Sequence, residues 1–564
     1  MKTKQSHSLL ALFIFTITCY VSAQKSSTIN ETNVYEGIEF NMPKVNTTSF
    51  PNYEVSIVDF GAITGGIIKN TDAFAKAINN VSTKGGGNVI VPRGVWLTGP
   101  ITFKSNINLH LEDGALIIFS KDFDDYPIIK TSFEGLNTVR CVSPINANEV
   151  ENIAITGNGI IDGSGDAWRP VKISKMTDGQ WKTLVRSGGV VSKDGKIWFP
   201  SEGSKKGYES STNFNVPDLI GDEELASVKD FLRPVMVSIV KSKRVLLDGP
   251  TFQNSPAWNI HPLMCEDVII RNINVRNPWY SQNGDGLDLE SCKNALVYNN
   301  TFDVGDDAIC FKSGKDKDGR DRAIPTENVI VKNNIVYHAH GGFVIGSEMS
   351  SGVKNVHISN CTFIGTDIGL RFKSTRGRGG IVENIYISNI DMIHIPTEAI
   401  GFNLYYSGKA PVLDDNETSD AKIQEEKLVE INEETPSFRN IFMKNINVAD
   451  SETAMFFMGL PEMNLKNISI ENSVFETKKG ITLINSDGIT LKNVKIKASD
   501  DFALTIYNSK NIKASNFDFT ESKSAIKALG PKTNNIEFDK KDISNEKEQI
   551  QQGMGLNKKA IKLQ

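Results

Sequence analysis

A short phrase of alternating polar and apolar positions recurs through the second half of the chain. It reads Asn, apolar, any residue, apolar, any residue, Asn, and it occurs at 294–299, 328–333, 355–360, 384–389, 440–445, 467–472 and 511–516. Alternation with a period of two is typical of a β-strand, and Asn tolerates the left-handed conformation of a tight corner. Each repeat is therefore predicted to form a strand, a corner and a second strand.

The spacing of these repeats predicts how the strands are arranged. Apolar anchors recur from Val268 to Ile536 at intervals of roughly 20 to 35 residues, with one interval of double length from Ile385 to Ile441. Short strands and corners at such a period indicate a parallel β-helix, whose coils stack about 4.8 Å apart. A β-propeller is the alternative, but its blades need four strands in roughly 40 to 50 residues. We therefore expect an all-β, single-domain solenoid over residues 51–540.

Two segments interrupt the repeat and are predicted to be loop insertions. The segment at about 407–436 includes 414–434, which holds nine acidic residues and two Lys and is best explained as a solvated loop. The segment at about 161–235 carries Trp168, Trp181 and Trp198. These Trp residues favour an ordered wall of a site, with burial against the solenoid as the alternative.

The two ends of the solenoid are predicted to be covered. Residues 70–81 form an amphipathic pattern, with Asn70 as N-cap, and are expected to form a helix over the first coil. Residues 24–50 would be an N-terminal extension. The polar segment 541–564 would be a C-terminal tail or cap.

The N-terminus has the pattern of a signal peptide. Lys2 and Lys4 precede an apolar run from Leu9 to Val21, and small residues follow. This run is too short to span a bilayer, so we expect residues 1–23 to be removed after Ala23 and the protein to be secreted or periplasmic, with no membrane association after cleavage.

Charge and cysteine content narrow the function classes. The chain has 62 basic and 67 acidic residues, a formal net charge of −5 that becomes −5 − 2 = −7 without the two N-terminal Lys. This balance disfavours nucleic acid as a partner. The Cys residues show no zinc-type spacing and are expected to be small buried side chains.

Four clusters of ionisable residues lie about one coil apart in the sequence. In chain order they are Asp285 with Asp288, Asp306 with Asp307, His340, and Arg371 with Lys373. We therefore expect these charged side chains to lie in one row on one face of the solenoid. Neighbouring carboxylates repel, which raises the pKa of at least one and provides an acid and a base for glycosidic hydrolysis. The cations suit an acidic substrate and disfavour the alternative, a Ca²⁺ site.

Six motifs in this chain resemble glycoside hydrolase family 28, the polygalacturonases, over nearly the whole mature length. They are Val58-Asp-Phe-Gly-Ala62, Gly85-Gly-Gly-Asn-Val-Ile-Val-Pro92, Asn283-Gly-Asp285, Gly305-Asp-Asp307, His340-Gly341 and Arg371-Phe-Lys373. The chain departs from the family pattern at Gly284, Ala339 and Phe372, but the charged groups of the last four motifs are intact.

The resemblance implies a right-handed, pectin-lyase-like parallel β-helix that hydrolyses α-1,4 bonds between galacturonates with inversion and without a metal or other cofactor. By motif, Asp306 would be the general acid, while Asp285 and Asp307 would orient and activate water and His340 would tune the acid. Arg371 and Lys373 would bind the substrate carboxylate. Further substrate-binding candidates are Asn283, Lys312, Tyr406, Tyr405 and His261.

The stretch from Lys312 to Arg320 and the run after His340 look most like the bacterial exo-acting branch, so we expect attack at chain ends of an acidic polysaccharide such as pectin or galacturonan. The alternatives are a rhamnogalacturonan or xylogalacturonan hydrolase of the same family, a calcium-dependent pectate lyase, and a non-catalytic β-helix that binds carbohydrate.

Overall fold

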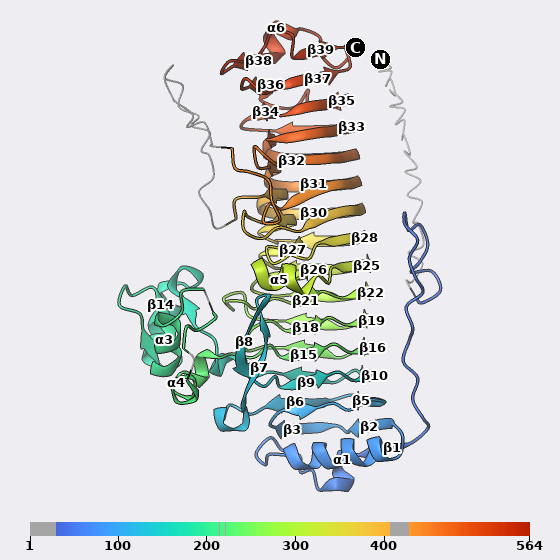
Figure 1. Cartoon of the computed structure of the whole chain (residues 1–564), viewed down its shortest axis with the longest axis vertical. Coiled ribbons are helices and arrows are strands. Elements are labelled where there is room, and N and C mark those ends of the chain that lie inside the picture. Colours follow the sequence, from blue (N-terminus) through green and yellow to red (C-terminus); the bar gives the residue numbers. More distant parts are fainter. Residues whose placement is uncertain (1–29, 214, 220, 407–427) are drawn as a thin grey trace, which may run out of the picture.

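The computed structural model describes residues 30–213, 215–219, 221–406 and 428–564. They form a long stack of coils that runs from α1 at one end to β39 at the other (Figure 1). The predicted parallel β-helix is confirmed, since one parallel sheet system holds 34 strands. The predicted signal peptide and most of the acidic insertion lie outside the described residues. No helix in the described ranges is long and apolar enough to cross a membrane.

Each coil contributes strands to three stacks, which form the faces of the solenoid. The first stack contains β4 (Ile101–Thr102), β9 (Ile145–Asn148), β15 (Val237–Val240), β18 (Ile260–Leu263), β21 (Leu287–Glu290), β24 (Asp307–Lys312), β27 (Gly341–Ile345) and β29 (Ile368–Lys373). The second contains β1 (Glu54–Ser56), β2 (Gly87–Val91), β5 (Ile107–Leu111), β10 (Glu151–Gly157), β16 (Lys243–Asp248), β19 (Glu266–Arg271), β22 (Lys293–Tyr298) and β25 (Thr326–Lys332). The third contains β3 (Gly94–Thr98), β6 (Ala115–Phe119), β11 (Ile160–Asp162), β17 (Thr251–Gln253), β20 (Asn274–Arg276), β23 (Thr301–Asp303) and β26 (Ile335–His338).

Towards the C-terminus, the strands of successive stacks merge into long strands that bend around the corners. These are β28 (Val353–Ile364), β30 (Ile381–Asn403), β31 (Ser437–Met458), β32 (Leu465–Ile484) and β33 (Ser486–Ala498). The last coils contain β34 (Phe502–Tyr507), β35 (Lys510–Asp518), β36 (Ser524–Leu529), β37 (Asn534–Phe538), β38 (Ile550–Gly553) and β39 (Ile561–Leu563), with α6 (Glu546–Gln549) between β37 and β38. Because β38 pairs with β36 and β39 pairs with β37, the C-terminal segment continues the solenoid.

The Asn residues of the repeat hold the corners. Asn294, Asn328, Asn355 and Asn384 all have positive φ, between 55° and 58°. Each of the last three donates from Nδ2 to Oδ1 of the preceding one, at 3.1 to 3.3 Å. The left-handed corner predicted from sequence is therefore present, and the same side chains also form a hydrogen-bonded ladder between coils.

Helix α1 (Thr71–Thr83) covers the open end of the first coil, as predicted (Figure 1). Its apolar side chains Phe74, Ile78 and Val81 are buried against the core. Asn70 precedes the helix, but its side chain forms no capping bond and instead accepts from the Ile63 amide at 2.7 Å. The N-terminal end of the solenoid core is thus shielded from water and from edge pairing.

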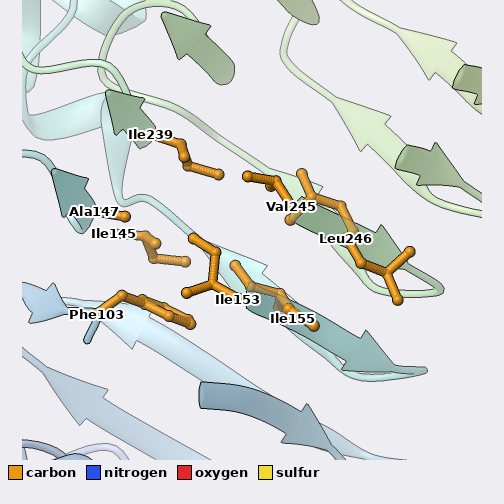
Figure 2. Close-up of a pocket in the computed structure, with 10 residues that line it drawn as sticks. Phe103, Ile145, Ala147, Ile153, Ile155, Ile239, Val245 and Leu246 are labelled. Atoms are coloured by element: carbon orange, nitrogen blue, oxygen red, sulfur yellow. The ribbon is translucent and has the colours of Figure 1, made fainter. Parts of the chain in front are cut away.

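The core of the solenoid is apolar and closely packed. One small gap, of about 10 Å³, lies between Phe103, Ile153 and Ile239 and is drawn in Figure 2. A gap this small and apolar is a packing defect and holds no ligand.

Residues 30–50 run along the outside of the second stack (Figure 1). Val34 and Val45 are buried there against outward-facing Leu246, Ile269 and Ile330. Glu39 also accepts a hydrogen bond from His357 at 2.6 Å. Residues 30–50 therefore form a strap that covers apolar surface on the solenoid.

Two excursions stand beside the first stack. The hairpin of β7 (Ile128–Phe133) and β8 (Leu136–Cys141) is antiparallel. The segment predicted as the 161–235 insertion projects sideways (Figure 1) and contains β12 (Val171–Lys172), β13 (Val190–Val191), β14 (Ile197–Phe199), α2 (Asp178–Arg186), α3 (Glu202–Glu209) and α4 (Asp222–Ala226). Helix α5 (Asp316–Arg322) follows β24. Trp168 is fully buried between Phe123 and Tyr126, in a cluster shared with Leu225 and Phe231 that is separate from the solenoid core.

Candidate active site

The first stack brings the predicted row of charged residues together. Asp285 lies in the loop before β21, Asp306 precedes β24 and Asp307 is its first residue, and His340 precedes β27. Arg371 and Lys373 both lie on β29, two coils beyond Asp307. One oxygen of each of Asp285, Asp306 and Asp307 lies within 4.8 Å of the others. The coil period thus converts distant sequence positions into one cluster.

Asp307 is held by two cations at the bottom of this cluster. Its Oδ2 lies 2.7 Å from Lys373 Nζ, and its Oδ1 lies 3.1 Å from Arg371 Nη1. Burial by itself would raise the pKa of Asp307, but Lys373 and Arg371 outweigh burial and lower the pKa far below the ordinary value for Asp. Asp307 is therefore ionised at neutral pH, and the two cations are largely buried with it.

Asp285 has the opposite electrostatic character. Burial, together with the nearby charges of Asp288 and Asp306, raises the pKa of Asp285 well above the ordinary value. Its Oδ1 has no hydrogen-bond partner among the described residues. Asp285 therefore gives up its proton at a higher pH than an ordinary Asp, because carboxylates this close cannot all ionise freely.

Asp306 and His340 are the more exposed members. Asp306 is half-buried, and its Oδ1 accepts a hydrogen bond from the Asp307 amide at 3.0 Å. His340 leaves 40% of its side chain exposed and bonds through Nδ1 to Asp367 Oδ2 at 2.7 Å. Within this cluster, Asp306 and His340 are thus the side chains that solvent and a ligand can reach.

Lys312 lies deeper than expected for a residue that binds substrate. It is buried and pairs with Glu348 at 3.1 Å and with Asp288 at 3.5 Å. Lys312 Nζ also sits 4.7 Å from the ring centroid of Trp258. Burial raises the pKa of Asp288, so Glu348, whose pKa is lowered by Lys312 despite burial, is the carboxylate that compensates the lysine.

The three remaining aromatic and imidazole candidates are placed differently. Tyr406 is half-buried beside the cations, with its ring centroid 5.1 Å from Lys373 Nζ and 5.7 Å from the Arg371 guanidinium. Tyr405 is buried and faces Arg376 at 5.4 Å. His261 is buried and bonds to Glu290 at 2.8 Å, so its ring is not open to a ligand. Tyr406 is the one of the three that borders the cluster.

Asn283 is fixed by groups from the two excursions. Its Oδ1 accepts from Arg233 Nη2 at 3.0 Å and from Asn215 Nδ2 at 3.2 Å. Asn215 also donates to Glu134 Oε1 at 2.6 Å, and Glu134 lies at the tip of the β7–β8 hairpin. The insertion and the hairpin therefore meet at Asn283, two residues before Asp285, at one side of the row.

Sequence reasoning did not single out several residues that the structure places here. Asp367 orients His340, Glu348 pairs with Lys312, and Glu134 and Arg233 surround Asn283. Asp367 and Glu348 lie within a few residues of recognised motifs, so proximity was an available signal. No sequence signal pointed to Glu134 in the hairpin or Arg233 in the insertion, because these segments belong to no repeat.

The fold and the site together define a parallel β-helix protein with a compact carboxylate cluster and adjoining cations. A family model described as glycosyl hydrolases family 28 matches residues 180–442. The crystal structure of a hyperthermoactive exopolygalacturonase from Thermotoga maritima is 33% identical, with a TM-score of 0.65, and the match covers 80% of this chain and 93% of that one. The chain belongs to glycosyl hydrolases family 28.

Two curated proteins are also similar. The exo-poly-alpha-D-galacturonosidase of Dickeya chrysanthemi is 29% identical over 416 residues, which is 72% of this chain and 63% of that protein. A probable polygalacturonase of Vitis vinifera is 28% identical over 350 residues, covering 60% of this chain and 61% of that protein. The chain thus spans less than two thirds of the length of these two relatives.

The raised pKa of Asp285 predicts a stabilising substitution. A carboxyl group whose pKa is higher in the folded than in the unfolded state costs stability once the pH exceeds the unfolded value of about 3.9. We expect Asp285→Asn to raise the Tm near pH 7 and to have little effect near pH 3, in thermal unfolding followed by circular dichroism. Asp303→Asn, at an exposed position, is the control. A lower Tm for Asp285→Asn at pH 7 would contradict the electrostatic account.

Proposed function

We propose that this protein hydrolyses α-1,4-galacturonosyl bonds of polygalacturonate or its oligomers. The observation that carries the proposal is the convergence of three carboxylates beside Arg371 and Lys373. Carboxylates supply acid and base to a glycosidic bond, and cations next to them suit a sugar that itself carries a carboxylate. The names of the Thermotoga and Dickeya relatives support the same substrate class.

In the proposed mechanism, Asp306 is the general acid. It is the carboxyl of the three that is half-buried, and so it is the one that a glycosidic oxygen can approach. His340, held by Asp367, borders it, and the His340 amide donates to the Asp306 carbonyl at 3.0 Å. Arg371, Lys373 and Tyr406 face the substrate carboxylate and ring, while Asn283 and Lys312 hold the surrounding loop and strand in place.

Water is proposed to be the attacking group, with inversion at the anomeric carbon. Asp285 and Asp307 are 3% and 1% exposed, so they cannot bond directly to a sugar carbon but can orient a water molecule above them. The nearest oxygens of the cluster are closer than the roughly 6.5 to 9.5 Å typical of inverting pairs and resemble the spacing of retaining ones. Burial is the stronger argument, because a covalent intermediate requires an accessible nucleophile.

We propose that the enzyme attacks a chain end, because the hairpin and the insertion block one side of the row. Glu134, Asn215 and Asn283 are hydrogen-bonded to each other next to Asp285, where a long polymer would otherwise continue. A site closed on one side accepts an end of a chain more readily than its middle. The exo-acting names of two relatives agree with this. With the pattern at residues 1–23, we propose that the enzyme acts after export.

Polygalacturonate incubated with the protein should release short products from the outset, while viscosity falls slowly. Proton NMR of the same reaction should show the β-anomer as the first product, because inversion converts the α-linkage. Rhamnogalacturonan, run in parallel, should be cleaved poorly. Collapse of viscosity before short products appear would contradict exo-attack, and an initial α-anomer would contradict inversion. Chelator-sensitive formation of unsaturated ends would instead identify a lyase.

A further inference from the structure

A second concave site lies on the same face of the solenoid, beneath the β7–β8 hairpin. It encloses about 780 Å³ between the hairpin and the outward side chains of β9, β15 and β18. Asn146 and Ser238, side by side on adjacent strands, form part of its floor. A volume of this size is in the range of small-ligand sites.

This pocket is separate from the catalytic row. Along the first stack, the pocket reaches from β9 through β15 to the end of β18, and the row of charged residues begins at Asp285, before β21 on the next coil. The space between is filled. Phe133 of the hairpin stacks on Trp258, with ring centroids 5.1 Å apart, and His261 bonds to Glu290.

The hairpin that roofs the pocket is fixed to the body of the protein. The Asn137 amide donates to Asp318 of α5 at 2.9 Å. Arg322 of α5 donates to Ser132 at 3.2 Å. The pocket therefore has a preformed roof, which lowers the cost of ordering a ligand.

The lining of the pocket carries a positive charge in a protein whose net charge is negative. Its charged residues are Lys130, Arg140, Lys241 and Glu149, which sum to 3 − 1 = +2. Lys130 is exposed, and Lys241 lies 3.4 Å from Glu149, with more than half of each side chain exposed. Both ammonium groups are therefore accessible to an anion.

Arg140 is a buried charge at the back of this pocket. Its guanidinium lies 4.0 Å from the Phe133 ring centroid, and Nη1 donates to the Phe231 carbonyl at 3.5 Å. Nε and Nη2 have no hydrogen-bond partner within the described ranges. Burial lowers the pKa of Arg140 to about 10, so it remains charged at neutral pH. Glu134 is the acidic group that acts on Arg140 electrostatically, and the unbonded N–H groups leave Arg140 able to attract a further anion through its field.

We propose that this pocket is a second, non-catalytic binding site for an acidic oligosaccharide, held through its carboxylates by Lys130 and Lys241 and by the field of Arg140. The choice of galacturonate oligomers as the ligand rests on the proposed function. Amide and hydroxyl groups such as Asn146, Asn148 and Ser238 can bind sugar hydroxyls, and half-buried Met264 offers an apolar surface for a ring. A site of this kind would keep a polymer or a released product on the enzyme behind the closed side of the catalytic row.

The test uses the full chain carrying Asp306→Asn, which holds both sites and is not expected to hydrolyse the probe. Titration calorimetry with trigalacturonate should give two classes of site. Adding Lys130→Glu should weaken one class by about tenfold or more, since it reverses a charge that contacts the ligand. Arg371→Ala should weaken the other class. Lys513→Glu, the same change at an exposed position on β35, is the matched control and should alter neither.

A second variant tests the space itself. Ser238→Trp should fill the pocket and remove the Lys130-dependent class, and circular dichroism should establish that the variant folds. In the protein with Asp306 intact, Lys130→Glu should raise KM for polygalacturonate and leave kcat on digalacturonate unchanged.

Several results would overturn the second site. They are a single class of site for trigalacturonate, no effect of Lys130→Glu, equal binding of the uncharged analogue galactotriose, or full competition by inorganic phosphate alone at the same concentration. Hydrolysis of polygalacturonate with a single class of site would reject the pocket and keep the proposed function. Lys130-dependent binding without hydrolysis of polygalacturonate would keep the pocket as a binding site and reject the proposed function.

Discussion

Asp306→Asn is expected to lower kcat for polygalacturonate by about 10²- to 10⁴-fold, the range typical for loss of a general acid or base. An amide has no proton to give to the leaving oxygen at neutral pH. Its oxygen can still accept the hydrogen bond from the Asp307 amide that Asp306 Oδ1 accepts at 3.0 Å. The Tm and the affinity for trigalacturonate should therefore change little.

The measurement is the initial rate of reducing-end release, with trigalacturonate affinity and Tm recorded on the same preparations. Asp303→Asn is the matched control, because Asp303 lies three residues earlier, at the end of β23, and is exposed. It should keep full activity. Turnover within a few-fold of the unaltered protein would remove Asp306 from the role of acid, and a large drop in Tm would mean that the loss of rate is structural.

Asp307→Asn is expected to abolish hydrolysis and also to destabilise the fold. Asp307 is the carboxylate that compensates buried Arg371 and Lys373, and removing one partner of a buried pair typically costs about 3 to 5 kcal/mol. Chemical denaturation at pH 7 should show a loss of this size. Glu327→Gln breaks a more exposed pair, Glu327 with Lys354 at 2.9 Å, and should cost no more than about 1 kcal/mol.

The effect of Asp307→Asn should depend on pH in a defined direction. The pKa of Asp307 is lower in the folded protein than in the unfolded chain, so the unfolded state binds the proton more readily. Its stabilising contribution is therefore complete above the unfolded pKa of about 3.9 and is lost as the pH falls toward the folded pKa. The difference in unfolding free energy between the two proteins should shrink progressively below about pH 4.

A second substitution separates the electrostatic cost from general disruption. Lys373→Met in the Asp307→Asn background removes one of the two unpaired cations, so part of the lost stability should return while hydrolysis stays absent. If stability at pH 7 is unchanged by Asp307→Asn, or if Lys373→Met restores none of the loss, the buried ion pairs do not have the role assigned to them.

The local pattern was sufficient for the fold and for which charged residues lie together in the row on the first stack. The Asn-bounded repeats predicted strands and corners, and the coil period aligned Asp285, Asp306 and His340. These features were predictable because a β-helix maps a fixed sequence interval onto a fixed distance of about 4.8 Å between coils.

The same reasoning could not rank the candidates within the row. Lys312 and His261 share the motif neighbourhood of the site, yet both are buried and bonded to carboxylates, Glu348 and Glu290. Whether a side chain on a strand faces a ligand or a neighbouring charge depends on what stands on the adjacent coils and on what covers them. That information is not present in the spacing of a motif.

The sequence by itself determined the solenoid, its capping helix and the set of charged groups at its corners, because these follow from periodicity. Tertiary structure alone decided that Asp307 is ionised, that Asp285 resists ionisation, and that the hairpin and the insertion meet at Asn283 beside the row. The physical reason is that pKa values and access depend on burial and on charges from segments far apart in sequence. Glu134 and Asn283, 149 residues apart, are brought within 3.4 Å by the fold.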